Sequence, residues 1–143
     1  MPTEDSDTPK LRVIVADDDP TIQRAIEWIL RRCCDVILKV TTGEQLVEAA
    51  LALQPDVIIT DTMTPAFFGS HAIQRPNTTG PFAVVLISDE PRDCRQWIDQ
   101  GASCVVHTMD LDSDLPKAIE AAANGDVFIS HRVIGASGEP RGH

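Results

Sequence analysis

The stretch LRVIVADDDP, residues 11–20, decides the fold, because an apolar run rich in β-branched residues ends abruptly in three aspartates and a proline. A short run of this kind is typical of a strand buried in a parallel sheet. A second run, DVIIT at residues 56–60, ends in the same way at Asp61. Ligands of open parallel sheets bind beyond the carboxyl ends of the strands. We therefore expect Asp17, Asp18 and Asp61 to form a compact acidic pocket suited to a hard divalent cation.

Apolar runs and helical patterns alternate along the whole sequence. We predict five strands, at residues 11–16, 36–40, 57–60, 82–87 and 104–107. Helical periodicity lies between them, at residues 22–33, 46–53, 91–100 and 115–123, whereas residues 64–81 indicate loops with only a turn or two of helix. This order predicts an α/β fold of (βα)5 type, a doubly wound parallel sheet with helices on both faces.

Individual residues refine the predicted helices. Thr42 and Gln45 form a capping-box pattern that opens the second helix. In the first two helices we expect Cys33 and Leu53 to face inward and Trp28 to pack on the helix face.

The composition predicts one domain with an acidic surface. The 143 residues include 22 acidic and 12 basic side chains, a net charge of −10, which disfavours direct binding of nucleic acid. No apolar stretch reaches 18 residues, so we expect no membrane span. The polar N-terminus differs from a signal peptide, and the four cysteines form no zinc or C-x-x-C pattern. We expect a cytoplasmic protein with reduced thiols.

The residues at the strand ends resemble those of the receiver domain of two-component response regulators. The matching positions follow successive strands and are Asp17-Asp18, Asp61, Pro65, Gly69, Ser88 and Gly101-Ala102. The resemblance implies the flavodoxin-like strand order 2-1-3-4-5. It divides the sequence into a disordered N-terminal tail (1–9), a receiver domain (10–126) and a C-terminal linker or tail (127–143).

The resemblance also implies a mechanism, in which a histidine kinase transfers a phosphoryl group to Asp61 in the presence of Mg²⁺. Asp18 would bind the ion directly and Asp17 through water, with Asp61 and the backbone carbonyl of Met63 as further ligands. Ser88 would contact a phosphoryl oxygen and move the following loop, so that the domain switches protein partners. Such a domain transfers the phosphoryl group to itself and is not an enzyme acting on other substrates.

Two positions depart from the family pattern. Thr108 stands where the family has a lysine, and it cannot supply the cation expected against the phosphoryl oxygens. His107, the neighbour of Thr108, is expected to face the opposite side of the strand from Thr108, so it is a poor substitute for the lysine. Val105 stands at the position of the aromatic switch residue. We hypothesise a receiver that is degenerate in output. The alternative is a phosphorylation-independent pseudo-receiver that serves as a dimerisation or protein-interaction module.

Simpler interpretations remain open for some of these residues. The aspartates at 17–19 could form only a helix-capping turn, and Asp19 is expected to be the cap itself. Ser88 could equally cap the helix that follows it. A small metal-dependent phosphatase would need a general acid at position 63, where this sequence has Met63.

The segment LPKAIEAAANGDVFIS, residues 115–130, suggests a further partner. It resembles the last helix and linker of regulators of the LuxR/FixJ class, which carry a LuxR-type helix-turn-helix domain. By this analogy the parent protein would be a transcription regulator with a DNA-binding domain.

Overall fold

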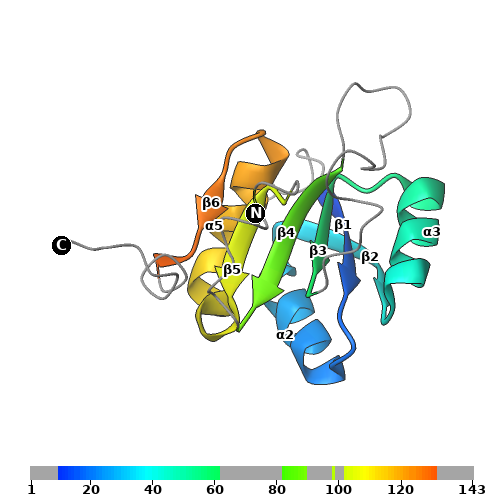
Figure 1. Ribbon diagram of the computed structural model, residues 1–143, viewed down its shortest axis with the longest axis horizontal. Helices are drawn as coiled ribbons and strands as arrows, with labels where there is room; N and C mark the ends of the chain where they lie inside the picture. The colour runs from blue at the N-terminus through cyan, green and yellow to red at the C-terminus, as the bar shows by residue number, and fades with distance from the viewer. Residues whose placement is uncertain (1–9, 62–81, 90–97, 99–101, 132–143) are drawn as a thin grey trace, which may run out of the picture.

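A computed structural model of the protein describes residues 10–61, 82–89, 98 and 102–131. A six-stranded sheet, with helices against both faces, forms its centre (Figure 1). The strands are β1 (Leu11–Ala16), β2 (Cys34–Val40), β3 (Val57–Thr60), β4 (Ala83–Ser88), β5 (Cys104–His107) and β6 (Phe128–Ile129). The helices are α2 (Pro20–Leu30), α3 (Gly43–Leu53), the short 3-10 helix η4 (Thr108–Asp110) and α5 (Leu111–Ala123).

All neighbouring strands of the sheet run parallel, in the order β2-β1-β3-β4-β5-β6. The predicted parallel α/β fold and the predicted order of the first five strands are therefore confirmed. The predicted strands at residues 11–16, 57–60 and 104–107 coincide with β1, β3 and β5. The last two of these are fully buried and rich in β-branched residues, which makes their ends easy to read from the sequence.

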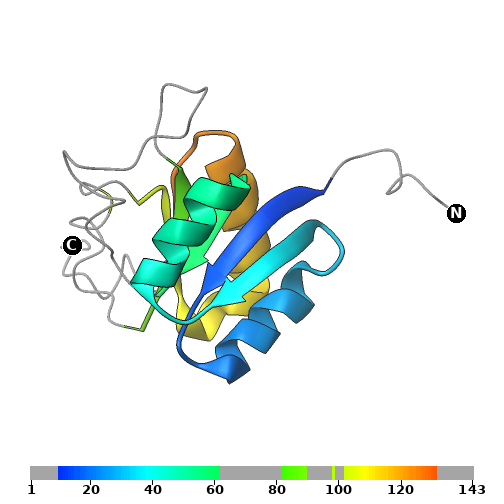
Figure 2. The same cartoon turned by 90° about the vertical axis from the view of Figure 1, so that its right-hand side faces the viewer.

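The helices form two layers, which bury alternate residues of the strands. On one face, α2 and α5 cover the side chains of Val13, Val15 and Ile59 among others. On the other face, α3 covers the intervening side chains, including Ile14 and Ile58. Figure 2 shows the sheet between α3 and α2. Burial on both faces explains why residues 13–16 of β1 and 57–59 of β3 are all apolar.

Side-chain caps define where the first two helices begin. The Asp19 carboxylate accepts a hydrogen bond from the Thr21 N–H at 2.9 Å, and Pro20 occupies the first helical turn of α2. Thr42 and Gln45 form the predicted capping box at the start of α3. The capping role predicted for Asp19 is thus confirmed.

Three predictions about side chains near the first two helices are wrong. Helix α2 ends at Leu30, so that Cys33 is exposed in the following turn and Cys34 is the buried first residue of β2. Leu53, at the end of α3, is 36% exposed instead of facing inward. Trp28 is 65% exposed, and the Arg31 guanidinium lies 3.6 Å from its ring centre. The stacked Arg31 guanidinium stabilises the indole in this exposed position.

The sheet also differs from the expected five strands. The residues after α5 return to the sheet as β6, which pairs with β5. A two-residue strand is too short to give a periodic pattern, so the sequence did not distinguish it from the predicted linker or tail. Among the helices described here, none is long and apolar enough to span a membrane.

Candidate functional site

The register between β1 and β3 brings the first carboxylates together. Ala16 lies opposite Thr60, and the Asp61 N–H donates to the Ala16 carbonyl at 3.2 Å. Asp17 and Asp61 therefore follow directly after matched positions of two adjacent strands. On the other side of β1, the Asp17 N–H donates to the Val40 carbonyl at 3.1 Å. The backbone of Asp17 is thereby tied into the edge of the sheet.

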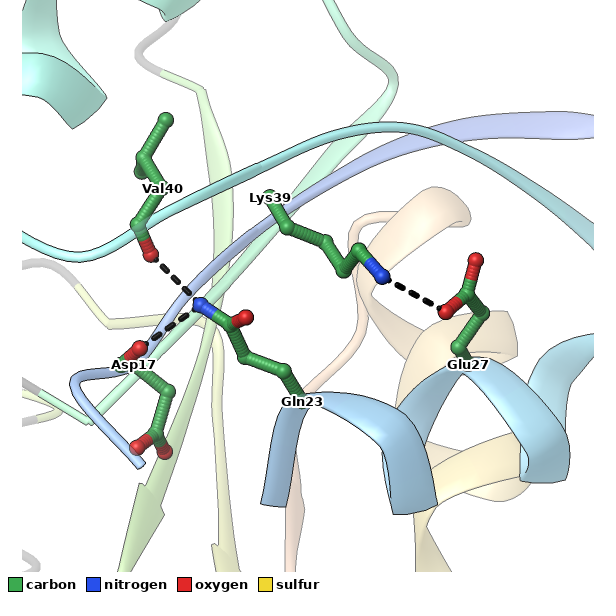
Figure 3. Close-up of polar contacts among 5 residues, drawn as sticks. All are labelled: Asp17, Gln23, Glu27, Lys39 and Val40. Atoms are coloured by element: carbon green, nitrogen blue, oxygen red, sulfur yellow. Dashed lines mark hydrogen bonds and ion pairs between the residues drawn. The ribbon is translucent and has the colours of Figure 1, made fainter. Parts of the chain in front are cut away.

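Gln23, near the start of α2, fixes the same edge of the sheet. Its side-chain amide donates to the Asp17 carbonyl at 2.7 Å and to the Val40 carbonyl at 2.8 Å (Figure 3). A single side chain thus joins the ends of β1 and β2 to α2. The Lys39–Glu27 ion pair, also drawn in Figure 3, links β2 to the same helix. Both partners are exposed, so we expect at most about 1 kcal/mol from this pair.

The carboxylates of Asp17, Asp18 and Asp61 converge beyond these strand ends. One oxygen from each lies within 4.8 Å of the others. Oxygen ligands of an octahedral Mg²⁺ lie about 3.0 Å apart in neighbouring positions and about 4.2 Å apart in opposite positions, so carboxylates gathered this closely could share one such ion, directly or through water. Three oxygen donors of negative charge fit a hard divalent cation. A capping turn alone accounts for Asp19 but not for this convergence.

Burial makes Asp17 unlike an ordinary surface carboxylate. Its side chain is buried, and the loss of hydration raises its pKa from 3.8 to about 6. The hydrogen bond from the Asp19 N–H to Asp17 Oδ1, at 2.8 Å, acts in the opposite direction. The charges of Asp61 and Asp18 raise the pKa further. A cation bound here would reverse this penalty, because it stabilises the ionised form.

A cleft of about 430 Å³ surrounds the carboxylates. It is formed by the ends of β1, β3, β4 and β5 and the start of α2, and is lined by Asp17, Asp18, Asp19, Ile22, Asp61, Ile87, Ser88, Asp89 and Thr108. None of these lining residues carries a positive charge. A second hollow, of about 570 Å³, lies between β2 and α3, but its lining contains no group of carboxylates.

The structure brings most of the predicted site residues into this one cleft. Ser88 ends β4 opposite His107 of β5, and Thr108 follows on η4. Val105, by contrast, is fully buried in β5. Met63 lies outside the described residues, as do Pro65, Gly69, Gly101 and the helix predicted at 91–100 apart from Ile98. The capping interpretation of Ser88 depends on that helix and stays a prediction.

The sequence reasoning missed two residues near the cleft. Gln23 holds the strand ends, and Asp89, after β4, adds a fifth acidic residue to the lining. In α2, Gln23 follows Ile22 and lies beside the apolar inner face of the helix. A polar residue at such a position was the signal that the sequence offered. Asp89 follows Ser88 directly, so its acidity was readable as a continuation of the strand-end pattern.

We predict that Asp17 makes the unfolding free energy of the metal-free protein depend on pH. Because the folded-state pKa lies above the unfolded value, Asp17 lowers stability as pH rises from about 4 to about 6, by at most about 2 to 3 kcal/mol. Urea unfolding in a chelator should show Asp17→Asn gaining stability relative to wild type over this range. Asp35→Asn, on the exposed side of β2, is the control. A stability difference between Asp17→Asn and wild type that does not change with pH would contradict this assignment.

Comparison with known proteins agrees with this geometry. Residues 13–125 match the model of the family described as "Response regulator receiver domain". The nitrate/nitrite response regulator protein homolog of Haemophilus influenzae is 30% identical over 129 residues, which cover 87% of this chain and 62% of that protein. The chain thus spans less than two thirds of the length of this relative.

Two solved structures show the same fold. A two-component response regulator of the LuxR family from Aurantimonas sp. SI85-9A1 superposes with a TM-score of 0.76 at 19% identity, covering 93% of this chain and 99% of that one. RcsB, in a structure of two dimers bound to two parallel DNAs, gives a TM-score of 0.72 at 22% identity, covering 90% of this chain and 68% of that one. With the family match over residues 13–125, these findings show that the protein belongs to the response regulator receiver domain family of two-component systems.

Proposed function

We propose that this receiver accepts a phosphoryl group on Asp61 from a histidine kinase, with Mg²⁺ held by Asp17, Asp18 and Asp61. The observation that carries the proposal is the convergence of these three carboxylates with Ser88 and Thr108 on one cleft. The backbone carbonyl of Met63 remains a predicted further ligand. A bound Mg²⁺ supplies the positive charge that a phosphoryl group needs in order to approach a carboxylate.

The residues of the cleft then have distinct roles. An Asp61 oxygen attacks phosphorus, forming an O–P bond while the bond from phosphorus to the kinase histidine nitrogen breaks. Asp18, which is exposed, would hold the ion directly, and Asp17, which is buried, would hold it through water. The Ser88 hydroxyl, at the end of β4, donates to a phosphoryl oxygen. Thr108 offers only a neutral hydroxyl where a cation would hold a second phosphoryl oxygen.

A second candidate function rests on the same two departures. The described residues that line the cleft include no cation, and Val105 is a small, fully buried side chain that cannot swing between two positions as an aromatic switch does. A phosphorylation-independent pseudo-receiver, used for dimerisation or protein interaction, would need neither feature. The two candidates differ in whether Asp61 is required for signalling.

The partners follow from the relatives, which are longer than this chain. We propose that the parent protein is a cytoplasmic transcription regulator with a LuxR-type DNA-binding domain and that it forms a homodimer. The LuxR-family match and the RcsB dimers on DNA support this proposal. The net charge of −10 favours contacts with DNA through such a domain and not through the receiver.

We predict that acetyl phosphate with Mg²⁺ produces one phosphoryl adduct on the wild-type protein, detected by intact mass. The adduct should be absent in a chelator and in Asp61→Asn, because the nucleophile is then lost. Asp35→Asn, which removes an equal charge far from the cleft, should react like wild type. An unmodified wild-type protein, under conditions that modify another receiver, would reject retained phosphorylation and favour the pseudo-receiver.

We also predict that Thr108→Lys strengthens the conformational response to Mg²⁺ and beryllofluoride, because the ammonium group supplies the missing cation. Amide exchange of β4 and β5 measures this response. Thr108→Met is the matched control, since it adds a side chain of similar length without charge. Equal responses in the lysine and methionine variants would show that the missing cation does not limit the switch.

A further inference from the structure

The segment beyond α5 is attached to the last full strand of the sheet. Gly125, with a φ of +82°, turns the backbone after the helix, and β6 then pairs with β5 through Cys104–Phe128 and Val105–Ile129. The Ser130 N–H extends this pairing by donating to the Val105 carbonyl at 2.9 Å. Ile129 also packs against the cluster formed by Val105 and Leu86.

Ser130 is fully buried, and its hydroxyl joins two other elements. Ser130 Oγ accepts a hydrogen bond from the His107 N–H at 3.1 Å and donates to Asp114 Oδ2 at 2.7 Å. The direction is fixed, since the amide can only donate and the carboxylate accepts. Asp114 lies on the first turns of α5 and also accepts from the exposed Ser113 hydroxyl at 3.2 Å.

The amide that Ser130 holds belongs to the last residue before the cleft. His107 ends β5 opposite Ser88, and the next residue, Thr108, lines the cleft. His107 Nδ1 accepts from the Met109 N–H at 3.0 Å, so the turn that presents Thr108 is fixed on both sides. One buried hydroxyl therefore links the C-terminal segment to the backbone that positions Thr108.

We propose that Ser130 is a positioning residue that couples the acidic cleft to the segment that follows α5. A ligand that contacts Thr108 and shifts the turn after β5 changes the strength of the His107–Ser130 hydrogen bond, and with it the docking of β6. By linkage, undocking of β6 changes the affinity of the cleft for that ligand by the same factor. This route needs no aromatic side chain, and it runs through the strand that carries Val105. The inference rests on the proposed function, because it requires a phosphoryl-like ligand in the cleft.

The test uses Mg²⁺ with beryllofluoride as the probe. Binding is followed by the fluorine NMR signal of the bound anion, and docking by amide exchange of residues 128–130. In the wild type, the probe should change the exchange of these amides. In Ser130→Ala the change should be lost, and the affinity for the probe should shift by about five-fold or more. Ser130→Thr keeps a hydroxyl and should restore part of the coupling.

Three controls separate coupling from general destabilisation. Ser113→Ala removes a hydroxyl that also contacts Asp114 but does not reach β5. Thr42→Ala weakens the cap of α3, away from the cleft. Both should keep the wild-type response. Asp114→Asn can still accept a hydrogen bond from Ser130, so it should retain more coupling than Asp114→Ala. This pair of variants tests the same hydrogen bond if Ser130→Ala does not fold.

The outcomes distinguish the two proposals. Binding of the probe with no change in exchange at residues 128–130, and with equal affinity in Ser130→Ala and wild type, overturns the coupling and leaves the proposed function standing. An equal loss of response in Thr42→Ala also overturns it. If the wild type does not bind the probe, the proposed function is overturned, and the coupling proposal, which depends on it, is overturned as well.

Discussion

The register of β1 against β3 is the constraint on which the site depends. A hydrogen bond from the Asp61 N–H to the Ala16 carbonyl, 3.2 Å long, sets that register at the edge of the sheet. Because side chains alternate between the faces of a strand, a slip of one residue would turn every buried side chain of β3 to the opposite face. Because β3 is buried on both faces, such a slip would exchange the side chains of the two core clusters and disrupt the packing of each. Packing of the interior thus places Asp17 beside Asp61.

This arrangement is electrostatically unfavourable without a cation. Burial and the neighbouring charges raise the pKa of Asp17, so its ionised form is disfavoured. The rest of the structure holds it in place through ordinary interactions: Gln23 ties the strand ends to α2, and Asp19 caps that helix. The core and the caps therefore maintain a group of carboxylates whose arrangement is suited to binding a cation. Position 108, which lines the cleft, is a neutral threonine and supplies no positive charge.

The sequence predicted the parts of the molecule that depend on long apolar runs and strong caps. β3 and β5 are buried on both faces, as is most of β1, and their polar ends therefore marked the cleft directly. The sequence failed where tertiary contacts decide. Cys33 and Leu53 continue helical patterns, yet one lies in the turn beyond α2 and the other is exposed at the last residue of α3.

The role of Ser130 was also invisible in the sequence. Its importance comes from contacts with residues 16 and 23 positions away in the sequence, Asp114 and His107, and neither contact leaves a local pattern. The polarity of Gln23 beside the apolar face of α2 could be seen in the sequence, but only the folded structure shows that this residue joins two strand ends. Single polar side chains that connect elements distant in sequence are the part that periodicity cannot report.

The most direct test of this account is a calorimetric titration of Mg²⁺ into the wild type, Asp18→Asn and Asp19→Asn. Asp18 and Asp19 are adjacent, exposed and equally charged, but only Asp18 belongs to the cluster with Asp17 and Asp61. Asparagine also preserves the cap at position 19. The account predicts saturable binding by wild type, a loss of about ten-fold or more in Asp18→Asn, and near wild-type affinity in Asp19→Asn. Equal losses in the two variants, or no saturable binding by the wild type, would contradict it.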